Sequence, residues 1–186
     1  MKASDAIRGR RSIKRFTDRP ITREEIEALI AAATLAPNHR LTNPWRFYVL
    51  GPNAREAYGR ALGERKAKKQ PDPAKAAEVR ETVAAEHRAL PAMIAVAVVE
   101  SADPEQREED YAATMMGIQN LMLRATELGL GTAIKTGGIM ADPAARAAVG
   151  LPDGQRIVAV VNLGAPADVP PPKERMPATA LTQWRD

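Results

Sequence analysis

The chain has 186 residues, and it contains no cysteine and only two histidines. The absence of cysteine excludes disulfides, thiol catalysis, iron–sulfur clusters and zinc sites built on cysteine. His39 and His87 show neither a metal-ligand spacing nor the context of a serine hydrolase, so neither a metal site nor a hydrolase is expected. Any redox chemistry must therefore come from a bound cofactor.

Aromatic residues and long apolar runs are also scarce. Aromatic residues make up 4% of the chain against 45% hydrophobic residues, so aliphatic and alanine packing must dominate the core. No apolar run approaches the roughly 20 residues of a membrane helix, and the segment MKASDAIRGRRS lacks an apolar signal core. We therefore expect a cytoplasmic protein with no membrane partner, folded as one domain over residues 1–186.

Positive charge is concentrated near the N-terminus of a chain with a net charge of +4. The basic residues of this cluster are Arg8, Arg10, Arg11, Lys14, Arg15 and Arg19. Such a cluster suits a phosphate group, a nucleic acid backbone or plain solvation. No recognition motif accompanies it, so we expect no nucleic acid partner, although a polyanion-binding module that uses this basic segment remains an alternative.

The pattern of apolar residues predicts alternating helices and strands. A capping box from Thr22 to Glu25 opens a helix, and continuous apolar runs predict strands near 47–50, 93–99 and 156–163. Helices are expected over 54–69, 74–88 and 110–128, with an acidic surface loop over 102–110. The region 66–87 is the candidate for a mobile lid or a variable excursion. Strands separated by several helices indicate an α+β or mixed α/β sandwich.

The expected helix at 110–128 is apolar around most of its circumference. Helices of this kind are buried, and a 20.1 kDa chain has limited interior to bury one. We interpret this helix as a dimer interface; the alternative is a central helix in a monomer.

The stretch Leu35 to Leu50, LAPNHRLTNPWRFYVL, is interpreted as a ligand loop. Pro37 and Pro44 bias the residues before them away from helix, so the chain must run extended there. Hydrogen-bonding side chains lie between the prolines, and loops between rigid elements often carry function. A polar connector closed by a core tryptophan, Trp45, is the alternative.

Two glycine-containing patterns fail as phosphate-binding motifs. In GLGTAIKT, residues 129–136, Ile134 stands at the glycine position that a phosphate loop requires before its Lys-Thr pair. Gly129-Leu130-Gly131 lacks the third glycine of a dinucleotide fingerprint.

Four motifs together resemble the FMN-dependent nitroreductase family, in its compact branch. They are the RRS segment at 10–12, the APNH…NPW loop, the KTGG stretch at 135–138 and the basic Lys173-Glu174-Arg175 near the end. The resemblance implies a nitroreductase-like three-layer α/β/α sandwich of the α+β class with a central, mainly antiparallel sheet. It also implies a homodimer with a helical interface.

The resemblance further implies which residues hold FMN. Arg10, Arg11 and Ser12 would hold the phosphate and ribityl chain, Lys14 would approach the flavin ring, and Lys173 with Arg175 would also reach the phosphate. His39 and Asn43 would contact FMN from the partner chain. Compact relatives commonly carry Trp-Arg-Ser beside the ring, whereas this chain has Ile134, Lys135 and Thr136, which leaves the tryptophan contact missing and the substrate preference open.

The implied activity is an NAD(P)H-dependent oxidoreductase in which FMN carries the chemistry and no catalytic side chain is required. NAD(P)H would reduce FMN, and nitro compounds or quinones would then accept the electrons in a ping-pong cycle. No ribose-phosphate motif distinguishes NADH from NADPH, and the physiological acceptor is not specified. A flavin-binding protein without turnover is a further alternative.

Overall fold

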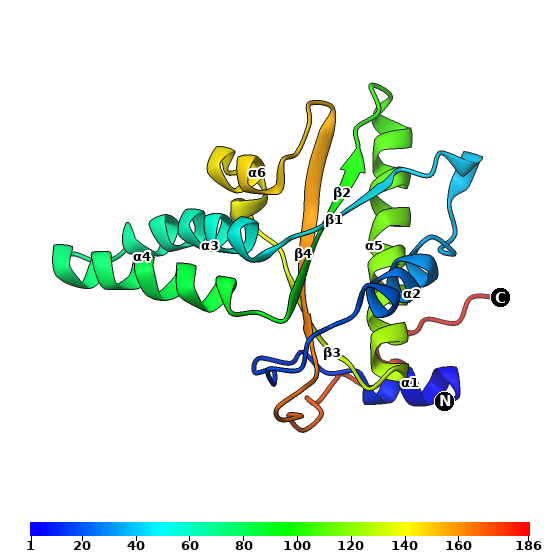
Figure 1. The fold of residues 1–186 in the computed structure, drawn as a ribbon. Helices are drawn as coiled ribbons and strands as arrows, with labels where there is room; N and C mark the ends of the chain where they lie inside the picture. Colours follow the sequence, from blue (N-terminus) through cyan, green and yellow to red (C-terminus); the bar gives the residue numbers. More distant parts are fainter.

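The computed structural model describes residues 1–186 and alternates helices with four strands (Figure 1). The helices and strands are α1 (Ala3–Gly9), α2 (Arg23–Ala33), β1 (Trp45–Val49), α3 (Pro52–Ala67), α4 (Pro73–Arg88), β2 (Ala92–Val99), α5 (Pro104–Glu127), β3 (Gly131–Lys135), α6 (Pro143–Val149) and β4 (Gln155–Gly164). None of these helices is long and apolar enough to cross a membrane.

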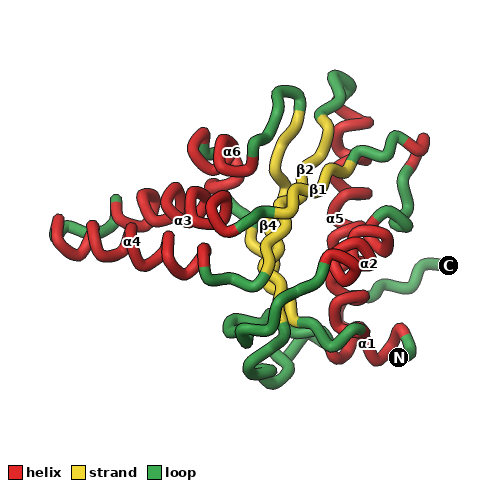
Figure 2. Tube along the Cα trace, in the orientation of Figure 1, coloured by secondary structure: helices red, strands yellow, loops and turns green.

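The strands form one antiparallel sheet in the order β1-β2-β4-β3. Successive side chains of a strand point to opposite faces, and in β2 both sets are apolar and are buried from Ala92 to Val98. Ile94 and Val96 pack toward α2 and α5, whereas Met93 and Ala95 pack toward α3 and α6. Figure 2 shows the strands between these two groups of helices. The predicted α+β fold with a helical layer on each face of an antiparallel sheet is therefore confirmed.

The N-terminal segment after α1 lies along the edge strand β3. Ser12 forms a parallel bridge with Thr132, and the N–H of Ile13 donates to the carbonyl of Thr132 at 2.9 Å. Gly131 permits this approach, because a Cβ there would lie 2.5 Å from Cγ1 of Ile13. Because Gly131 has no side chain, the basic segment can lie against the edge of the sheet.

Helices α3 and α4 form an antiparallel hairpin that projects from the sheet (Figure 1). Gly59 allows close packing, because a Cβ there would lie 2.7 Å from Cβ of His87 and 2.8 Å from the carbonyl oxygen of Val83. Buried Arg55 donates to the carbonyl oxygens of Leu50 and Arg88, both at 3.1 Å, and so ties the hairpin to the end of β1. The region 66–87, which the sequence analysis named as a lid or excursion, comprises the end of α3, the turn and most of α4.

Helix α5 starts earlier than the sequence predicted. Pro104 occupies its first turn, and the side chain of Asp103 accepts a hydrogen bond from the N–H of Glu105 at 3.0 Å. These are standard N-terminal helix signals, so the prediction of a loop over 102–110 was wrong from residue 104 onward. The helix is also not covered all round within one chain, since Met116 is 42% exposed and Leu128, the residue that follows the helix, is 37% exposed.

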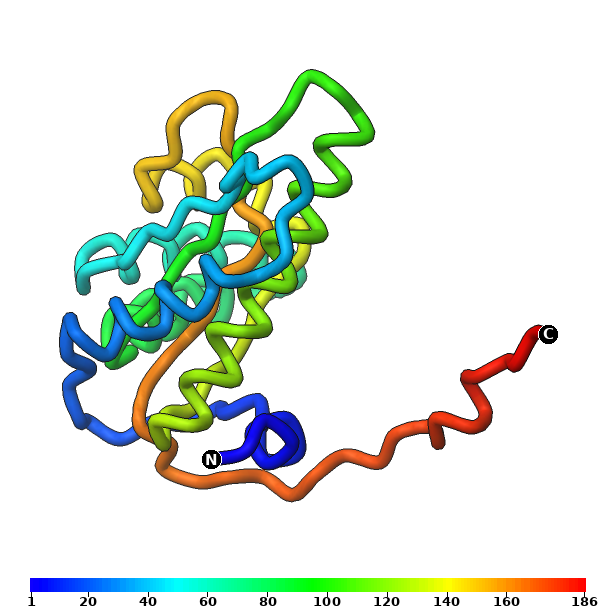
Figure 3. Tube along the Cα trace, turned by 90° about the vertical axis from the view of Figure 1, so that its right-hand side faces the viewer, coloured from blue at the N-terminus to red at the C-terminus, as the bar shows by residue number.

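The chain after β4 is extended. Residues 171–186 are all exposed, and Figure 3 shows them leaving the body of the molecule. Their only regular element is a short 3₁₀ turn, Ala178–Leu181. This matches the prediction that the proline-rich tail cannot form one long regular element.

Candidate functional site

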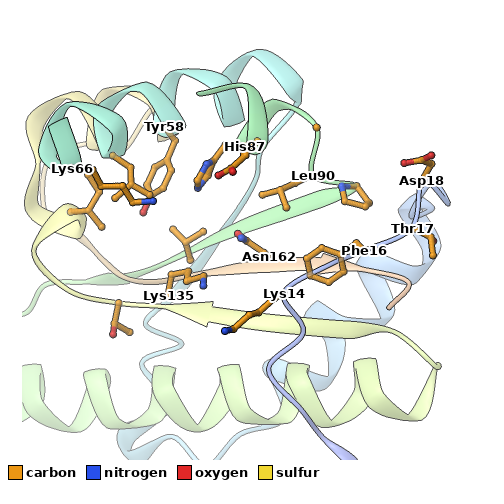
Figure 4. Close-up of a pocket in the computed structure, with 17 residues that line it drawn as sticks. Lys14, Phe16, Thr17, Asp18, Tyr58, Lys66, His87, Leu90, Lys135 and Asn162 are labelled. Atoms are coloured by element: carbon orange, nitrogen blue, oxygen red, sulfur yellow. The ribbon is translucent and has the colours of Figure 1, made fainter. Parts of the chain in front are cut away.

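A cavity of about 640 Å³ lies between the sheet and the α3–α4 hairpin (Figure 4). Its volume falls within the range of roughly 300–1,000 Å³ that is typical of small-molecule sites. The sheet side of the cavity, with the N-terminal segment beside it, is here called the floor; the hairpin side is called the roof. Floor residues include Lys14, Phe16, Lys135, Thr136, Val160 and Asn162; roof residues include Tyr58, Leu62, Lys66, Glu86, His87 and Leu90.

Three lysines from separate segments line the cavity. Lys14 comes from the N-terminal segment, Lys66 from α3 and Lys135 from the end of β3. None of them forms an ion pair with a carboxylate of the chain. Asp18 and Glu86 are the acidic residues of the lining, so positive charge is in excess. A concave surface with such an excess attracts anionic ligands.

Asn162 provides a buried polar group on the floor. It is 9% exposed, and its Oδ1 has no hydrogen-bond partner in the protein. Figure 4 shows its amide directed into the cavity. A buried acceptor left unpaired costs about 1–3 kcal/mol, so this oxygen is suited to a donor on a ligand. The sequence analysis did not select Asn162; the available signal was a single polar residue within the apolar run of β4.

His87 and Tyr58 are uncharged groups of the roof at neutral pH. Nδ1 of His87 lies 2.8 Å from the carbonyl oxygen of Val83; because a carbonyl only accepts, Nδ1 carries the hydrogen. Burial lowers the pKa of His87, and the nearby charges of Lys66 and Lys135 lower it further, so neutral His87 keeps Nε2 as an acceptor. Burial also raises the pKa of Tyr58 to about 12. The sequence analysis did not assign a site role to either residue.

The structure brings several predicted cofactor residues to the floor. Lys14, Lys135 and Thr136 line the cavity. Ser12 lies on the same side of the extended N-terminal segment as Lys14, because side chains two residues apart share a face. The hydroxyl of Ser12 and the guanidinium of Arg10 have no partner in the protein and are available to a ligand.

The side chains of Arg11 and Ile134 do not line the cavity. Nη1 of Arg11 donates to the carbonyl oxygens of Arg8 and Arg10 at 2.6 and 2.9 Å, which closes the end of α1. The side chain of Ile134 packs against the core cluster that contains α5, on the face of the sheet away from the cavity. Any contact of Ile134 with a ligand in the cavity must therefore come from its main chain.

The proline-flanked loop with His39 and Asn43 does not line the cavity of its own chain. It lies beside the N-terminal part of α5, where Nδ1 of His39 is 2.8 Å from Oε1 of Glu109 and the Thr42 hydroxyl donates to buried Asp110. Arg40, Leu41 and Asn43 have φ values of 64°, 51° and 47°, in the left-handed region, which asparagine tolerates but arginine and leucine rarely adopt. The loop is thus held in a specific conformation that is strained at Arg40 and Leu41.

The predicted phosphate residues of the tail are also remote from the cavity. Lys173 and Arg175 are exposed, and neither lines the cavity; they belong to the extended C-terminal segment that leaves the body of the molecule in Figure 3. One chain therefore assembles Lys14, Lys135 and Thr136 at the cavity, whereas His39, Asn43, Lys173 and Arg175 lie elsewhere.

Comparison with known proteins gives matches over nearly the whole chain. A family model described as "Nitroreductase family" matches residues 7–165. The Bacillus subtilis protein named "Putative NAD(P)H nitroreductase YfhC" is 35% identical over 176 residues, which cover 93% of this chain and 89% of the relative. A crystal structure of a nitroreductase-like family protein from Bacillus cereus superposes with a TM-score of 0.86 and 31% identity, covering 100% of this chain and 96% of that chain.

One similar structure was solved with a cofactor. A crystal structure described as "a putative nitroreductase in complex with FMN", from Desulfovibrio desulfuricans, has a TM-score of 0.73 and 25% identity, and the match covers 100% of this chain and 98% of that chain.

Proposed function

Because the chain belongs to the nitroreductase family, we propose that it is an NAD(P)H-dependent FMN oxidoreductase that reduces nitro compounds or quinone-like acceptors. When bound, FMN supplies the redox chemistry, taking a hydride from NAD(P)H and passing the electrons to an acceptor in a second, ping-pong half-reaction. The protein contributes binding, orientation, charge and the exclusion of water, without a catalytic side chain.

The unpaired amide oxygen of Asn162, together with the unpaired lysines around it, is the observation that carries this proposal. The pyrimidine edge of a flavin alternates carbonyl oxygens with an N–H group. Ammonium groups donate to carbonyl oxygens, and an amide oxygen accepts from an N–H. The donor and acceptor set of the cavity therefore fits FMN. Lys14 and Lys135 would also place positive charge where reduction adds negative charge.

We assign the phosphate and ribityl chain to Arg10 and Ser12, whose polar groups have no protein partner. Arginine suits a phosphate because it stays charged and presents paired donors. Lys173 and Arg175 would add further charge once the tail is placed against a neighbouring surface, and the main chain near Ile134 and Thr136 would flank the ring.

We propose that the functional unit is a homodimer. Two exposed apolar residues, Met116 within α5 and Leu128 directly after it, provide a surface for a second copy. His39 and Asn43 lie outside the cavity of their own chain, so in the dimer they would act on the site of the partner. Apolar roof residues such as Leu62 and Leu90 would limit water at the bound ring.

The proposal is tested by the visible spectrum of the purified protein, recorded before and after anaerobic addition of NADPH and, separately, of NADH. A yellow protein that either nucleotide bleaches supports the enzyme. A yellow protein that neither bleaches indicates flavin binding without turnover. A colourless, well-folded protein that refuses added FMN at low salt and binds DNA with steep salt dependence favours the polyanion-binding alternative.

The phosphate assignment has its own test. We expect Arg10→Ala combined with Ser12→Ala to weaken FMN binding about 10- to 100-fold, because hydrogen bonds to charged groups contribute about 1.5–3 kcal/mol. The dissociation constant is measured by flavin fluorescence titration. Arg8→Ala, which removes a neighbouring exposed arginine that pairs only with Asp5, is the matched control and should bind FMN normally. Unchanged FMN affinity in the double variant removes the assignment.

A further inference from the structure

Lys66 is the only lysine on the roof of the cavity. It lies in the last turn of α3, and its neighbours Lys68 and Lys69 do not line the cavity. Figure 4 shows Lys66 entering from the hairpin side, across from Lys135 on the floor. The charges of both lysines lower the pKa of His87, and the charge of Glu86 raises it, so these groups all face the same cavity.

The floor already offers a complete set of groups for a cofactor. Lys14, Lys135 and Asn162 all lie on that side and have unpaired polar atoms. A planar ring that satisfies these groups leaves the ammonium group of Lys66 facing the remaining space. No carboxylate of the chain pairs with Lys66, and Glu86, the acidic residue of the roof, lies beyond ion-pair distance.

The rest of the roof suits an aromatic ring. Tyr58 and Leu62 are presented by the same helix as Lys66, and Leu90 and Ile139 add further apolar surface. An aromatic molecule in contact with these side chains places a charged substituent near Lys66. The side chain of Lys66 is exposed, and an aromatic ring that displaces water beside its unpaired ammonium group would strengthen the preference for an anionic substituent over a neutral one.

We propose that Lys66 makes the enzyme selective for electron-poor aromatic acceptors that carry an acidic group, such as a nitroaromatic carboxylate or phenolate. This inference rests on the proposed function and specifies its acceptor class. Lys66 is then the specificity-determining contact of the acceptor, and the roof and floor serve different ligands.

The test compares 4-nitrobenzoate with 4-nitrobenzamide, which have nearly the same size and differ in charge. The unaltered protein should show a higher kcat/KM for 4-nitrobenzoate, and this preference should shrink as ionic strength rises. Lys66→Met keeps the apolar stem and removes the charge; it should lower kcat/KM for 4-nitrobenzoate about 10-fold, mainly through KM, because a charge-assisted contact is lost. The value for 4-nitrobenzamide should remain within about twofold.

A binding measurement accompanies the kinetics. Calorimetric titration of the FMN-loaded protein with benzoate should give a dissociation constant that rises about 10-fold in Lys66→Met, while benzamide binding is unchanged. Lys69→Met, a lysine of the same segment that does not line the cavity, is the matched control and should behave like the unaltered protein.

The outcomes separate this inference from the proposed function. Equal use of both substrates with no dependence on salt, or an equal loss for both substrates in Lys66→Met, overturns the selectivity and leaves the oxidoreductase intact. Weaker FMN binding in Lys66→Met with unchanged selectivity makes Lys66 a cofactor ligand and also overturns it. A protein that takes up no FMN, or is not reduced by NAD(P)H, overturns the proposed function itself.

Discussion

Single residues in the cavity retain polar groups that the fold leaves unsatisfied. Asn162 interrupts the apolar core of β4 with an unpaired amide oxygen, and His87 has one committed ring nitrogen and one without a protein partner. The buried, unpaired oxygen of Asn162 lowers stability in the absence of a ligand, and natural proteins tolerate such costs mainly at functional sites. Its placement across one cavity from the free ring nitrogen of half-buried His87 supports a ligand site.

His87 should make stability depend on pH. Its pKa in the folded protein lies below the usual value of 6.5, so the unfolded chain holds more protons at intermediate pH and acid favours unfolding. The contribution is intact above about pH 6.5 and is lost as pH falls through the lowered pKa, with a slope of at most about 1.4 kcal/mol per pH unit. Urea denaturation across this window should show a shallower loss in His87→Gln than in the unaltered protein. Parallel curves for the two proteins contradict this prediction.

The α3–α4 hairpin is the element that forms the roof, and glycine sets its packing distance. At Gly59 the two helices approach so closely that α4 occupies the space of a side chain. The same backbone carries His87, so the position of the roof depends on this contact. Arg55, one turn before Gly59 on α3, binds the main-chain carbonyls of Leu50 and Arg88 at the same end of the hairpin. The roof is therefore a packed element anchored at the end that joins the sheet.

Gly59→Ala should destabilise the protein although alanine favours helix. The added Cβ would lie 2.7 Å from Cβ of His87, and overpacking of this kind costs about 1–3 kcal/mol, against about 0.5–1 kcal/mol gained in helix propensity. Thermal and urea denaturation measure the net loss of stability. Gly9→Ala is the control, because its Cβ would meet only Thr126 at 3.7 Å. Equal stability of the two variants would show that the hairpin can separate without cost.

At the scale of the whole molecule, one chain does not bring all of the predicted site residues together. The loop with His39 and Asn43 is held at α5, and the tail with Lys173 and Arg175 extends away from the body. Helix α5 also leaves apolar surface exposed, at Met116. A second copy would both cover the helix and receive the loop and the tail.

Mixed dimers test this sharing of residues. In the proposed dimer, each FMN site uses Arg10 and Ser12 of one subunit and the loop of the other subunit. Arg10→Ala with Ser12→Ala removes the contacts from the first subunit, and His39→Ala with Asn43→Ala removes those from the second. Each variant alone should bind FMN weakly. A mixed dimer, isolated with two different affinity tags, contains one site in which both sides are intact, so it should recover tight FMN binding at that site. Absence of recovery in verified mixed dimers shows that the loop acts on its own chain.

Local patterns determined a large part of this fold. The capping box at Thr22 and Glu25 forms as predicted, with reciprocal hydrogen bonds of 3.2 and 3.0 Å. The apolar runs appear as β2 and β4 because a strand covered on both faces must be apolar throughout. The basic segment and the motifs around it indicated the family, which the comparisons confirm. These features depend on neighbours in the sequence.

Other features were decided only by the tertiary structure. Strand β3 has five residues, too few for the spacing of apolar residues to distinguish a strand from a turn. It is a strand because it pairs with β4. Asn162 and His87 face one cavity only because the α3–α4 hairpin covers that face of the sheet, and Ile134 turns away because the register of β3 places it on the other face. The sequence by itself determined which segments form helices and strands and which family motifs they carry. Packing between distant segments determined which polar groups meet, because which element covers which face is a non-local property of the chain.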